Sequence, residues 1–409
     1  MKKALALLLA VVLVVGCFAA CSGNNGGETP KDTANYSNVK VGLICLHSEE
    51  STYDKNFLNG MEEAKKNLGL TDDQVIIVKN IAESNDCYET AADLVDEGCN
   101  VIFADSFGHE TYLLKAAEEF PEVQFCHATG TQAHVKGLDN YHNAFAAIYE
   151  GRYLAGVAAG LKLNEMIESG KITADKAKMG YVGAFTYAEV ISGYSSFYLG
   201  AKSVCPSVTM DVQFTGSWYD ETAEKTTALA LINNGCVLIS QHADSMGAPS
   251  ACEEKNVPNV SYNGSTVESC PNTHIISSRI NWAPYFEYMV KCVATGEKIA
   301  TDWTGTIATN SVVLSDLNTK AAAEGTQEKL DAVKAQLVDG SISVFDTKNF
   351  TVKGETLKEY LADVDGDYTG ETNVINENGI FVESGDGFRS APYFDLEIDG
   401  ITRLNVNFG

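Results

Sequence analysis

The chain has 409 residues, a formal net charge of −26 at pH 7 and 45% hydrophobic residues. A chain of this length exceeds what one hydrophobic core usually supports, so we expect two domains. A surface this acidic repels phosphate backbones, which argues against a nucleic acid as partner.

The N-terminus has the pattern of an export signal, for which we assign residues 1–20. Lys2 and Lys3 precede a short apolar run and then small residues. The run is shorter than the roughly 20 residues that a membrane span needs. "FAACSGN" resembles the lipobox of bacterial lipoproteins, although Phe18 departs from it. That resemblance implies a lipid on Cys21, with Cys17 as the alternative site and an unlipidated secreted protein as another. Residues 21–38 are polar, which is typical of a flexible linker.

Eleven cysteines do not form an obvious disulfide framework. Nine remain after the export region, an odd number, and they show neither CxxC nor metal-ligand spacing. Cys45, Cys126 and Cys236 lie inside apolar runs, where cysteine behaves as a small buried hydrophobe. We therefore expect mostly free thiols, with one or two bridges left open.

Short β-branched runs alternate with helical patterns along the chain, which indicates parallel sheets covered by helices on both faces. The series occurs twice, so we predict an α/β protein with two doubly wound parallel-sheet lobes. The expected strands are 40–46, 74–80, 100–106, 123–129, 178–185, 208–216, 236–242 and 259–264.

The order of these runs divides the chain into two lobes. We expect lobe 1 at 39–160, completed by about 275–310, and lobe 2 at 161–274, completed by about 311–409. Residues after about Thr347 are poor in helical pattern and rich in Gly, Asp and Asn. We expect them to form short strands and loops that wrap lobe 2.

Ligands of open parallel sheets bind outside the carboxyl ends of the strands, so the residues that follow each strand are the candidates. These segments contain many aromatic, amide and hydroxyl side chains and one lysine, which suits a flat, uncharged ring. The candidate ligand-binding residues are Tyr53, Asp54, Phe57, Ser106, Phe107, Gly108, Phe185, Trp218, Asp244, Asn263 and Trp282.

Several motifs resemble the basic membrane protein family, the purine-nucleoside-receptor-like lipoproteins of ABC importers. They are "DKNF", "EGRYLAGVAAG", "KMGYVGAF" and "GSWYD", and they occur in the order that the family has. The resemblance implies the clamshell of type I periplasmic binding proteins, with a purine between the lobes. It implies that the Phe57 ring stacks on the purine. Trp218 is our choice for the opposite face, with Phe185 or Phe107 next. Phe57 as a hydrophobic staple at a helix start is the alternative.

The chain also departs from the family pattern. Asn263 stands where nucleoside-binding members have the aspartate that binds the ribose hydroxyls, and Arg279 falls near the family's ribose-contacting lysine. Losing a carboxylate weakens a bidentate contact with a diol. A free nucleobase is therefore an alternative to a nucleoside as the ligand, and a non-purine ligand also stays open.

Four other features each have two interpretations. Asp244 is either a ligand acceptor or a helix N-cap, and Trp282 reaches either the ligand or the lobe interface. His109 and His127 could form a metal or catalytic pair, but isolated histidines are more often hydrogen-bond donors. "DVDGDYTGE" has part of a calcium-loop pattern but no Glu twelve positions from Asp363, so we favour a solvated acidic turn.

These patterns predict a substrate-binding lipoprotein on the outer face of the cell membrane. We expect a monomer that delivers a purine base or nucleoside to an ABC permease, without cofactor, metal or catalytic residues. The alternatives are a secreted nucleoside-processing enzyme and a ligand-sensing lipoprotein that does not transport. The enzyme would need a clustered set of acids or a nucleophile at a strand end, and neither is evident.

Overall fold

The structure is a computed structural model that describes residues 35–385 and 387–405. The expected export signal and both possible lipid sites, Cys17 and Cys21, lie outside the described residues. In the described part of the chain, no helix combines the length and apolar character that crossing a membrane requires.

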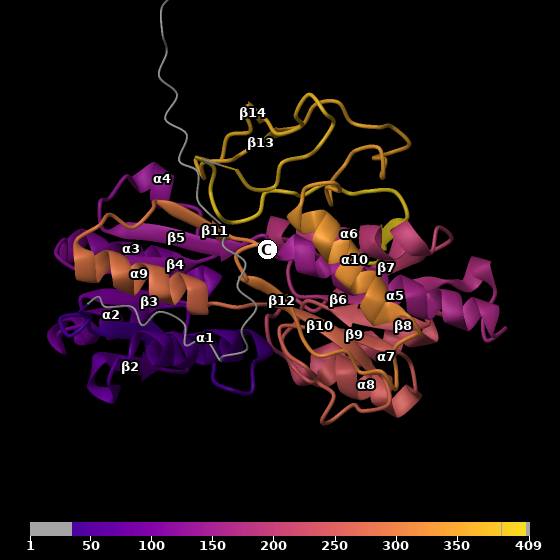
Figure 1. The fold of residues 1–409 in the computed structure, drawn as a ribbon, viewed down its shortest axis with the longest axis horizontal. Coiled ribbons are helices and arrows are strands. Elements are labelled where there is room, and N and C mark those ends of the chain that lie inside the picture. The colour runs from indigo at the N-terminus through magenta and orange to yellow at the C-terminus, as the bar shows by residue number, and fades with distance from the viewer. Residues whose placement is uncertain (1–34, 386, 406–409) are drawn as a thin grey trace, which may run out of the picture. The chain divides into compact units, whose positions relative to one another are not determined.

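The first sheet has six parallel strands in the order β11-β5-β4-β3-β1-β2 (Figure 1). Helices α1 and α9 cover one face of it, and α2 and α3 cover the other. The strands are β1 (Val41–Ile44), β2 (Val75–Val78), β3 (Val101–Ala104), β4 (Gln124–Ala128), β5 (Tyr141–Ala146) and β11 (Asp302–Gly305). The helices are α1 (Thr52–Leu68), α2 (Asn85–Asp96), α3 (Glu110–Glu119), the short α4 (Ala133–Lys136) and α9 (Ala283–Thr295).

The second sheet has seven strands in the order β12-β10-β9-β8-β6-β7-β15, of which only β12 pairs antiparallel. Helices α5 and α6 cover one face, α7 and α8 cover the other, and α10 packs on α5. The strands are β6 (Lys178–Gly183), β7 (Thr209–Phe214), β8 (Leu238–Gln241), β9 (Asn259–Tyr262), β10 (His274–Ile280), β12 (Val312–Leu314) and β15 (Ile401–Arg403). The helices are α5 (Ile148–Glu168), α6 (Ala188–Val204), α7 (Glu221–Asn233), α8 (Gly247–Lys255) and α10 (Thr326–Val338).

The predicted α/β class and all eight predicted strands are confirmed. Two lobe boundaries need correction. Helix α5 packs on α6 and β10, so the first crossing falls near residue 147 instead of 160. Strand β10 belongs to the second sheet, so the chain returns to the first lobe at α9 instead of at residue 275.

Helix α1 has a defined cap at each end. Ser51 is the N-cap, and its hydroxyl accepts a hydrogen bond from the backbone N–H of Asp54. Gly69 ends the helix at φ 69°, a left-handed conformation that glycine adopts without steric cost. These ends hold Tyr53 in the first turn, next to the carboxyl end of β1.

Helices α5 and α6 approach each other closely because small residues face each other. A Cβ on Gly156 would collide with the carbonyl oxygen of Phe197, and one on Gly200 with that of Tyr153. The "GRYLAGVAAGL" stretch is therefore a packing surface between the two helices.

The C-terminal segment, residues 347–405, carries β13 (Leu361–Ala362), β14 (Thr372–Asn373) and β15. It wraps the second lobe, since β15 extends the second sheet beside β7. It also contacts the first lobe, which the sequence did not predict: the Gln132 side chain donates to the carbonyl oxygen of Gly366 at 2.9 Å. In "DVDGDYTGE", the Asp363 and Asp367 carboxylates accept hydrogen bonds from the backbone of their own turn.

The nine cysteines of the described chain are all buried and free, which confirms the prediction of free thiols. Burial is the main cause that raises the pKa of the Cys126 and Cys236 thiols to about 12.

Candidate ligand-binding site

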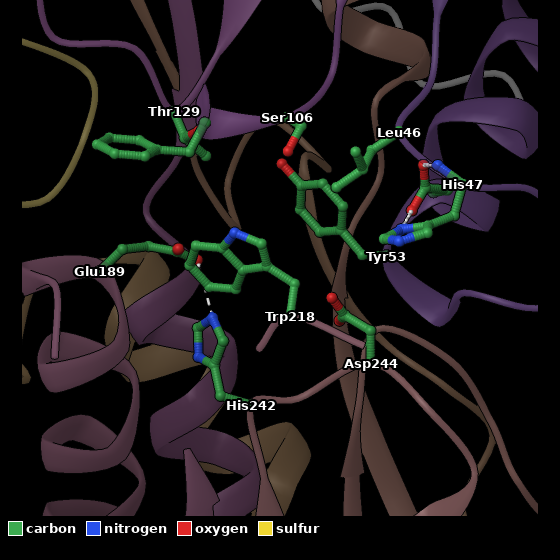
Figure 2. A pocket seen from close by; sticks show the side chains of 11 residues that line it. Leu46, His47, Tyr53, Ser106, Thr129, Glu189, Trp218, His242 and Asp244 are labelled. Atoms are coloured by element: carbon green, nitrogen blue, oxygen red, sulfur yellow. Dashed lines mark hydrogen bonds and ion pairs between the residues drawn. The ribbon is translucent and has the colours of Figure 1, made fainter. Parts of the chain in front are cut away.

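The site lies where the strand order of both sheets reverses. Strands β2-β1-β3-β4-β5 and β7-β6-β8-β9-β10 follow the same pattern, with reversals between β1 and β3 and between β6 and β8. Ligands of doubly wound sheets bind outside the carboxyl ends of strands at such points. The residues directly after β1, β3 and β8 do line one inner cavity here (Figure 2). Its lining residues are Leu46, His47, Tyr53, Asp54, Ser106, Phe107, Thr129, Glu189, Trp218, His242 and Asp244.

An outer cavity adjoins the inner one, because Phe107, Thr129, Glu189 and Trp218 line both. The inner cavity has a volume of about 30 Å³ and the outer one about 410 Å³. A water molecule needs about 10–15 Å³ on this scale, so the inner cavity has room for about two waters. A bicyclic ring can enter the inner cavity only if the lobes separate or Trp218 moves.

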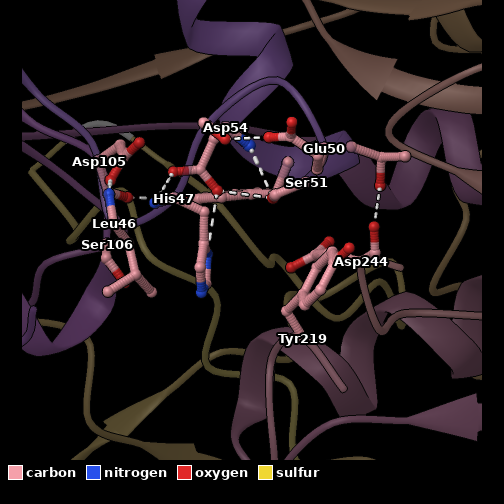
Figure 3. A network of polar contacts seen from close by, with 12 residues as sticks. Leu46, His47, Glu50, Ser51, Asp54, Asp105, Ser106, Tyr219 and Asp244 are labelled. Carbon is pink, nitrogen blue, oxygen red and sulfur yellow. Dashed lines mark hydrogen bonds and ion pairs between the residues drawn. The ribbon is translucent and has the colours of Figure 1, made fainter. Parts of the chain in front are cut away.

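The first-lobe wall contains a buried network around Asp54 (Figure 3). The backbone N–H of His47 donates to Asp54 Oδ1 at 2.7 Å, and the Ser51 hydroxyl donates to Oδ2 at 2.6 Å. Burial acts to raise the pKa of Asp54, but the hydrogen bonds from His47 and Ser51 bring it below its usual value. The wall therefore presents an ionised carboxylate to the cavity.

Asp105 lies behind this wall and has the opposite pKa shift. It is fully buried, and the backbone N–H of Leu46 donates to its Oδ1 at 3.0 Å. Burial, and next the charge of Asp54, raise the pKa of Asp105 well above its usual value. Cys45, Asp54 and Asp105 lie close enough to hold a metal ion. Two of these three residues already support the wall: Asp105 accepts a hydrogen bond from Leu46, and Asp54 accepts hydrogen bonds from His47 and Ser51.

The second-lobe wall contains Asp244, which is 6% exposed. Its Oδ1 accepts a hydrogen bond from the Asn263 side chain at 3.0 Å. Burial, and next the charge of Glu224, raise its pKa well above the usual value, which favours the protonated form. The N-cap interpretation is wrong, because α8 begins at Gly247 with Met246 at the cap position.

Hydrogen bonds join the two lobes beside this wall. The backbone N–H and the hydroxyl of Thr52 both donate to the carbonyl oxygen of Asp244, at 3.2 and 3.0 Å. The Asn56 side chain donates to Asn263 Oδ1 at 3.2 Å. Asn263 therefore connects α1 to the second lobe from behind Asp244, and it does not line either cavity.

Aromatic rings from both lobes face the cleft. Tyr53 comes from the first lobe and Trp218 from the second (Figure 2), and Phe107 adds a further ring from the first lobe. Phe185 does not line the cavities; it supports Trp218 edge-on, with ring centroids 4.8 Å apart. The ring centroids of Tyr187 and Phe107 lie 5.0 Å apart, so the two rings connect the two sides of the outer cavity. Of the other predicted residues, Ser106 lines the inner cavity and Gly108 the outer one.

Phe57 and Trp282 are corrections to the predicted site. Both are buried in the first lobe, where their rings stack with centroids 4.4 Å apart. Tyr53 and Phe57 lie four positions apart and share one face of α1. Tyr53, in the first turn, reaches the cavity, whereas Phe57, one turn further, packs into the core between α1 and α9.

His109 and His127 are hydrogen-bonded interior residues, as the more common interpretation predicts. Their Nε2 atoms lie 2.9 Å from the carbonyl oxygen of Ile81 and 2.7 Å from that of Ser106. Burial is the main cause that lowers the pKa of both rings, to about 4 for His109.

Several lining residues were not among the named candidates. His47, Thr129, Glu189 and His242 follow strands, so position alone could have indicated them. Glu189 and His242 form a pair across the second-lobe wall, with Oε1 and Nε2 3.3 Å apart. Four residues of the C-terminal segment line the outer cavity without any such signal: Tyr368, Arg389, Ala391 and Pro392.

Comparison with solved structures gives the same fold. An ABC transporter solute-binding protein from Conexibacter woesei superposes with a TM-score of 0.60 at 18% identity, covering 75% of this chain and 98% of that one. One from Aeropyrum pernix has a TM-score of 0.61 at 16% identity, covering 79% and 94%.

Curated relatives match about three fifths of this chain. A purine-binding protein of Brucella abortus is 31% identical over 63% of this chain and 69% of its own. A putative ABC transporter glucose-binding protein of Haloferax volcanii is 28% identical, over 60% and 59%. An ABC transporter nucleoside-binding protein of Lactococcus lactis is 23% identical, over 62% and 69%. The family profile described as "ABC transporter substrate-binding protein PnrA-like" matches residues 43–348. The chain belongs to this family, known as Bmp.

Proposed function

We propose that this substrate-binding protein captures a purine base or nucleoside in the cleft and delivers it to an ABC permease. A lipid on Cys21 would hold it on the outer face of the cell membrane. The observation that carries the proposal is the inner cavity, in which Tyr53 and Trp218 accompany two carboxyl groups of opposite pKa shift. The names of the Brucella and Lactococcus relatives support a purine or nucleoside.

The aromatic rings provide flat apolar faces for the heterocycle. Stacking of a base on an aromatic side chain contributes about 1–3 kcal/mol. In this proposal Tyr53 replaces Phe57 as the first-lobe ring, because it belongs to the same helix face and reaches the cavity. Trp218, supported by Phe185, provides the ring of the second lobe.

The two carboxyl groups provide the polar selection. Ionised Asp54 accepts a hydrogen bond from a ring N–H, and protonated Asp244 can donate to a ring nitrogen or carbonyl oxygen. A ring that leaves these buried groups unpaired loses about 1–3 kcal/mol for each. A heterocycle with both donor and acceptor edges, such as a purine, satisfies the pair.

Binding is coupled to closure of the lobes in this mechanism. The hydrogen bonds from Thr52 to Asp244 and from Asn56 to Asn263 connect the lobes beside the cavity. A ligand that contacts both walls favours the state in which these bonds are made, and the permease recognises that state.

The test is a thermal-shift and calorimetry panel of adenine, guanine, hypoxanthine, their ribonucleosides and glucose on residues 35–409. A ligand that binds the folded state at 100 times its Kd stabilises it by about 2.7 kcal/mol. We expect a shift with at least one purine and none with glucose. A shift with glucose alone would overturn the proposal, and release of free base from a nucleoside would favour the enzyme.

A further inference from the structure

The C-terminal segment contributes to the walls of the cleft, although it lies beyond the region that matches the family profile. Two of its loops do so, residues 363–371 and 388–392, which we call the cover loops. Tyr368 comes from the first loop, and Arg389, Ala391 and Pro392 come from the second. The facing walls come from both lobes, with Phe107 and Thr129 on one side and Tyr187 and Trp218 on the other.

The C-terminal segment is attached to the second lobe by extensive contacts. Strand β15 pairs with β7 in the second sheet, and the Asn405 side chain bonds both the N–H and the carbonyl oxygen of Phe214, at 2.8 and 2.9 Å. An aromatic cluster adds apolar packing, in which the Phe345 and Phe394 rings stack 4.1 Å apart. This attachment combines backbone pairing with buried apolar area.

The contacts with the first lobe are few and polar, and we call them the latch contacts. Asp302 Oδ1 in β11 accepts from the backbone N–H and the hydroxyl of Ser390, at 2.6 and 2.9 Å. The Gln132 side chain donates to the carbonyl oxygen of Gly366 at 2.9 Å and to the Tyr368 hydroxyl at 3.2 Å. Figure 1 shows the segment in yellow and orange, from the side of β11 and α4 to that of α6 and β7.

The fit at Gly366 shows that the loop lies directly against the first lobe. Gly366 has φ +85°, and a Cβ there would collide with the carbonyl oxygen of Thr131. Thr131 itself lines the outer cavity, so this contact closes one border of that cavity. Only glycine combines this backbone conformation with so close an approach.

The difference between the two attachments determines which one opens. Local opening takes place where buried apolar contacts are few. Ser390 is only 3% exposed, so its bonds with Asp302 are polar but lie below the surface. Tyr368 is 80% exposed, whereas the Phe345 and Phe394 rings are buried. We therefore expect the latch contacts with the first lobe to break first, while β15 keeps the segment bound to the second lobe.

We propose that the cover loops are part of the ligand-binding machinery. They close the outer cavity over a bound ligand, and opening of the latch contacts limits how fast ligand enters and leaves. Tyr368 and Arg389 then restrict the size of the group that a bound ring can carry into the outer cavity. This inference rests on the proposed function, in that it takes the cleft as the purine site.

The test compares latch variants with a matched control in the same lobe. Asp302→Ala and Gln132→Ala remove the acceptor and the donor of the latch contacts. Asp139→Ala removes an exposed carboxylate that pairs with Lys298 at the surface of the first lobe. Tyr368→Ala is the variant with the smallest expected effect on stability, because its side chain is largely exposed.

Two readouts separate the inference from the proposed function. Without ligand, hydrogen exchange of residues 363–371 and 388–392 should rise about tenfold or more in Asp302→Ala, and not in Asp139→Ala. With inosine and hypoxanthine as probes, stopped-flow Trp fluorescence should show association and dissociation both faster by about threefold or more, with Kd changed less than either rate. Tyr368→Ala should also accelerate both rates.

Each outcome decides one of the two proposals. Faster exchange with unchanged rates would overturn the inference, because the loops would open without limiting ligand entry. Unchanged exchange and unchanged rates would show that the latch contacts do not hold the loops, which also overturns it. Failure of the wild-type protein to bind either probe, while glucose binds, would overturn the proposed function and the purine-specific inference with it.

Discussion

The two walls of the inner cavity shift the pKa of a buried carboxyl group in opposite directions. In the first lobe, His47 and Ser51 donate hydrogen bonds to Asp54 and keep its pKa low. In the second lobe, Asp244 is buried near Glu224, which raises its pKa. Environments that move two pKa values apart create one acceptor and one potential donor from the same residue type. The cavity thereby offers complementary partners to a ligand with both donor and acceptor edges.

The largest expected effect is a loss of stability, and it distinguishes a residue of the first-lobe core from one of the first-lobe cavity wall. Phe57→Ala removes a fully buried ring that stacks on Trp282, so it should lower the free energy of unfolding by about 3–5 kcal/mol. Tyr53→Ala should lower ligand affinity with a smaller stability loss, because its ring faces the cavity. Urea denaturation and calorimetry measure the two quantities. A stable Phe57→Ala protein that fails to bind would show that Phe57 does contact the ligand.

The carboxyl groups themselves can be compared by matched substitutions. Asp54→Asn removes an ionised acceptor and should weaken binding by about 1.5–3 kcal/mol, the range for hydrogen bonds to charged groups. Asp244→Asn should change the affinity less, because an amide resembles a protonated carboxyl group. Calorimetry with the purine that binds best measures both. Equal losses would mean that the walls do not differ in charge.

The aromatic faces provide the next comparison. Trp218→Ala should weaken binding by about 1–3 kcal/mol, the contribution of one stacked base. Trp218→Phe should retain part of the affinity because it keeps a ring next to Phe185. Phe185→Leu serves as the control for lost support behind Trp218. If Trp218→Ala binds like the wild type, the second lobe does not provide a stacking face.

The smallest expected effect concerns pH and the first-lobe end of the cover loops. The contact with Asp302, whose Oδ2 lies 3.0 Å from His134 Nε2, is the main cause that raises the pKa of His134 above 6.5, and the Phe388 carbonyl and Asp365 act in the same direction. A raised histidine pKa contributes stability below the unfolded-state value and loses it as pH rises through the folded-state value. Exchange of residues 388–392, corrected for intrinsic rates, should therefore increase above about pH 6.5. His134→Gln should remove this dependence, and an unchanged profile in that variant would contradict the assignment.

Much of the fold follows from patterns that act over short distances. "KVGLICL" and the seven similar runs each became a strand, because continuous apolar β-branched stretches between helices suit a buried parallel sheet. The position just after the strands also led to Tyr53, Asp54, Trp218 and Asp244, which do line the inner cavity; that they bind a ligand stays a prediction.

The errors come from contacts that no local pattern encodes. Spacing places Tyr53 and Phe57 on one face of α1 but does not say where along the helix the cavity ends and the core begins. Asn263 aligned with a ligand-contacting position, yet its side chain connects Asn56 to Asp244. Tyr368 and Arg389 reach the cleft from a segment far along the chain, through loops without periodicity.

The nine buried thiols have a consequence for what happens after the fold is lost. In the native chain, burial raises the pKa of thiols such as Cys126 and Cys236, which suppresses the thiolate form, the nucleophile in disulfide exchange. In an unfolded chain exposed to air, all nine thiols would be accessible with their ordinary pKa. Random disulfides would then form and trap the chain before it could refold. Denaturation of this protein should be reversible in the presence of a reductant and irreversible without one.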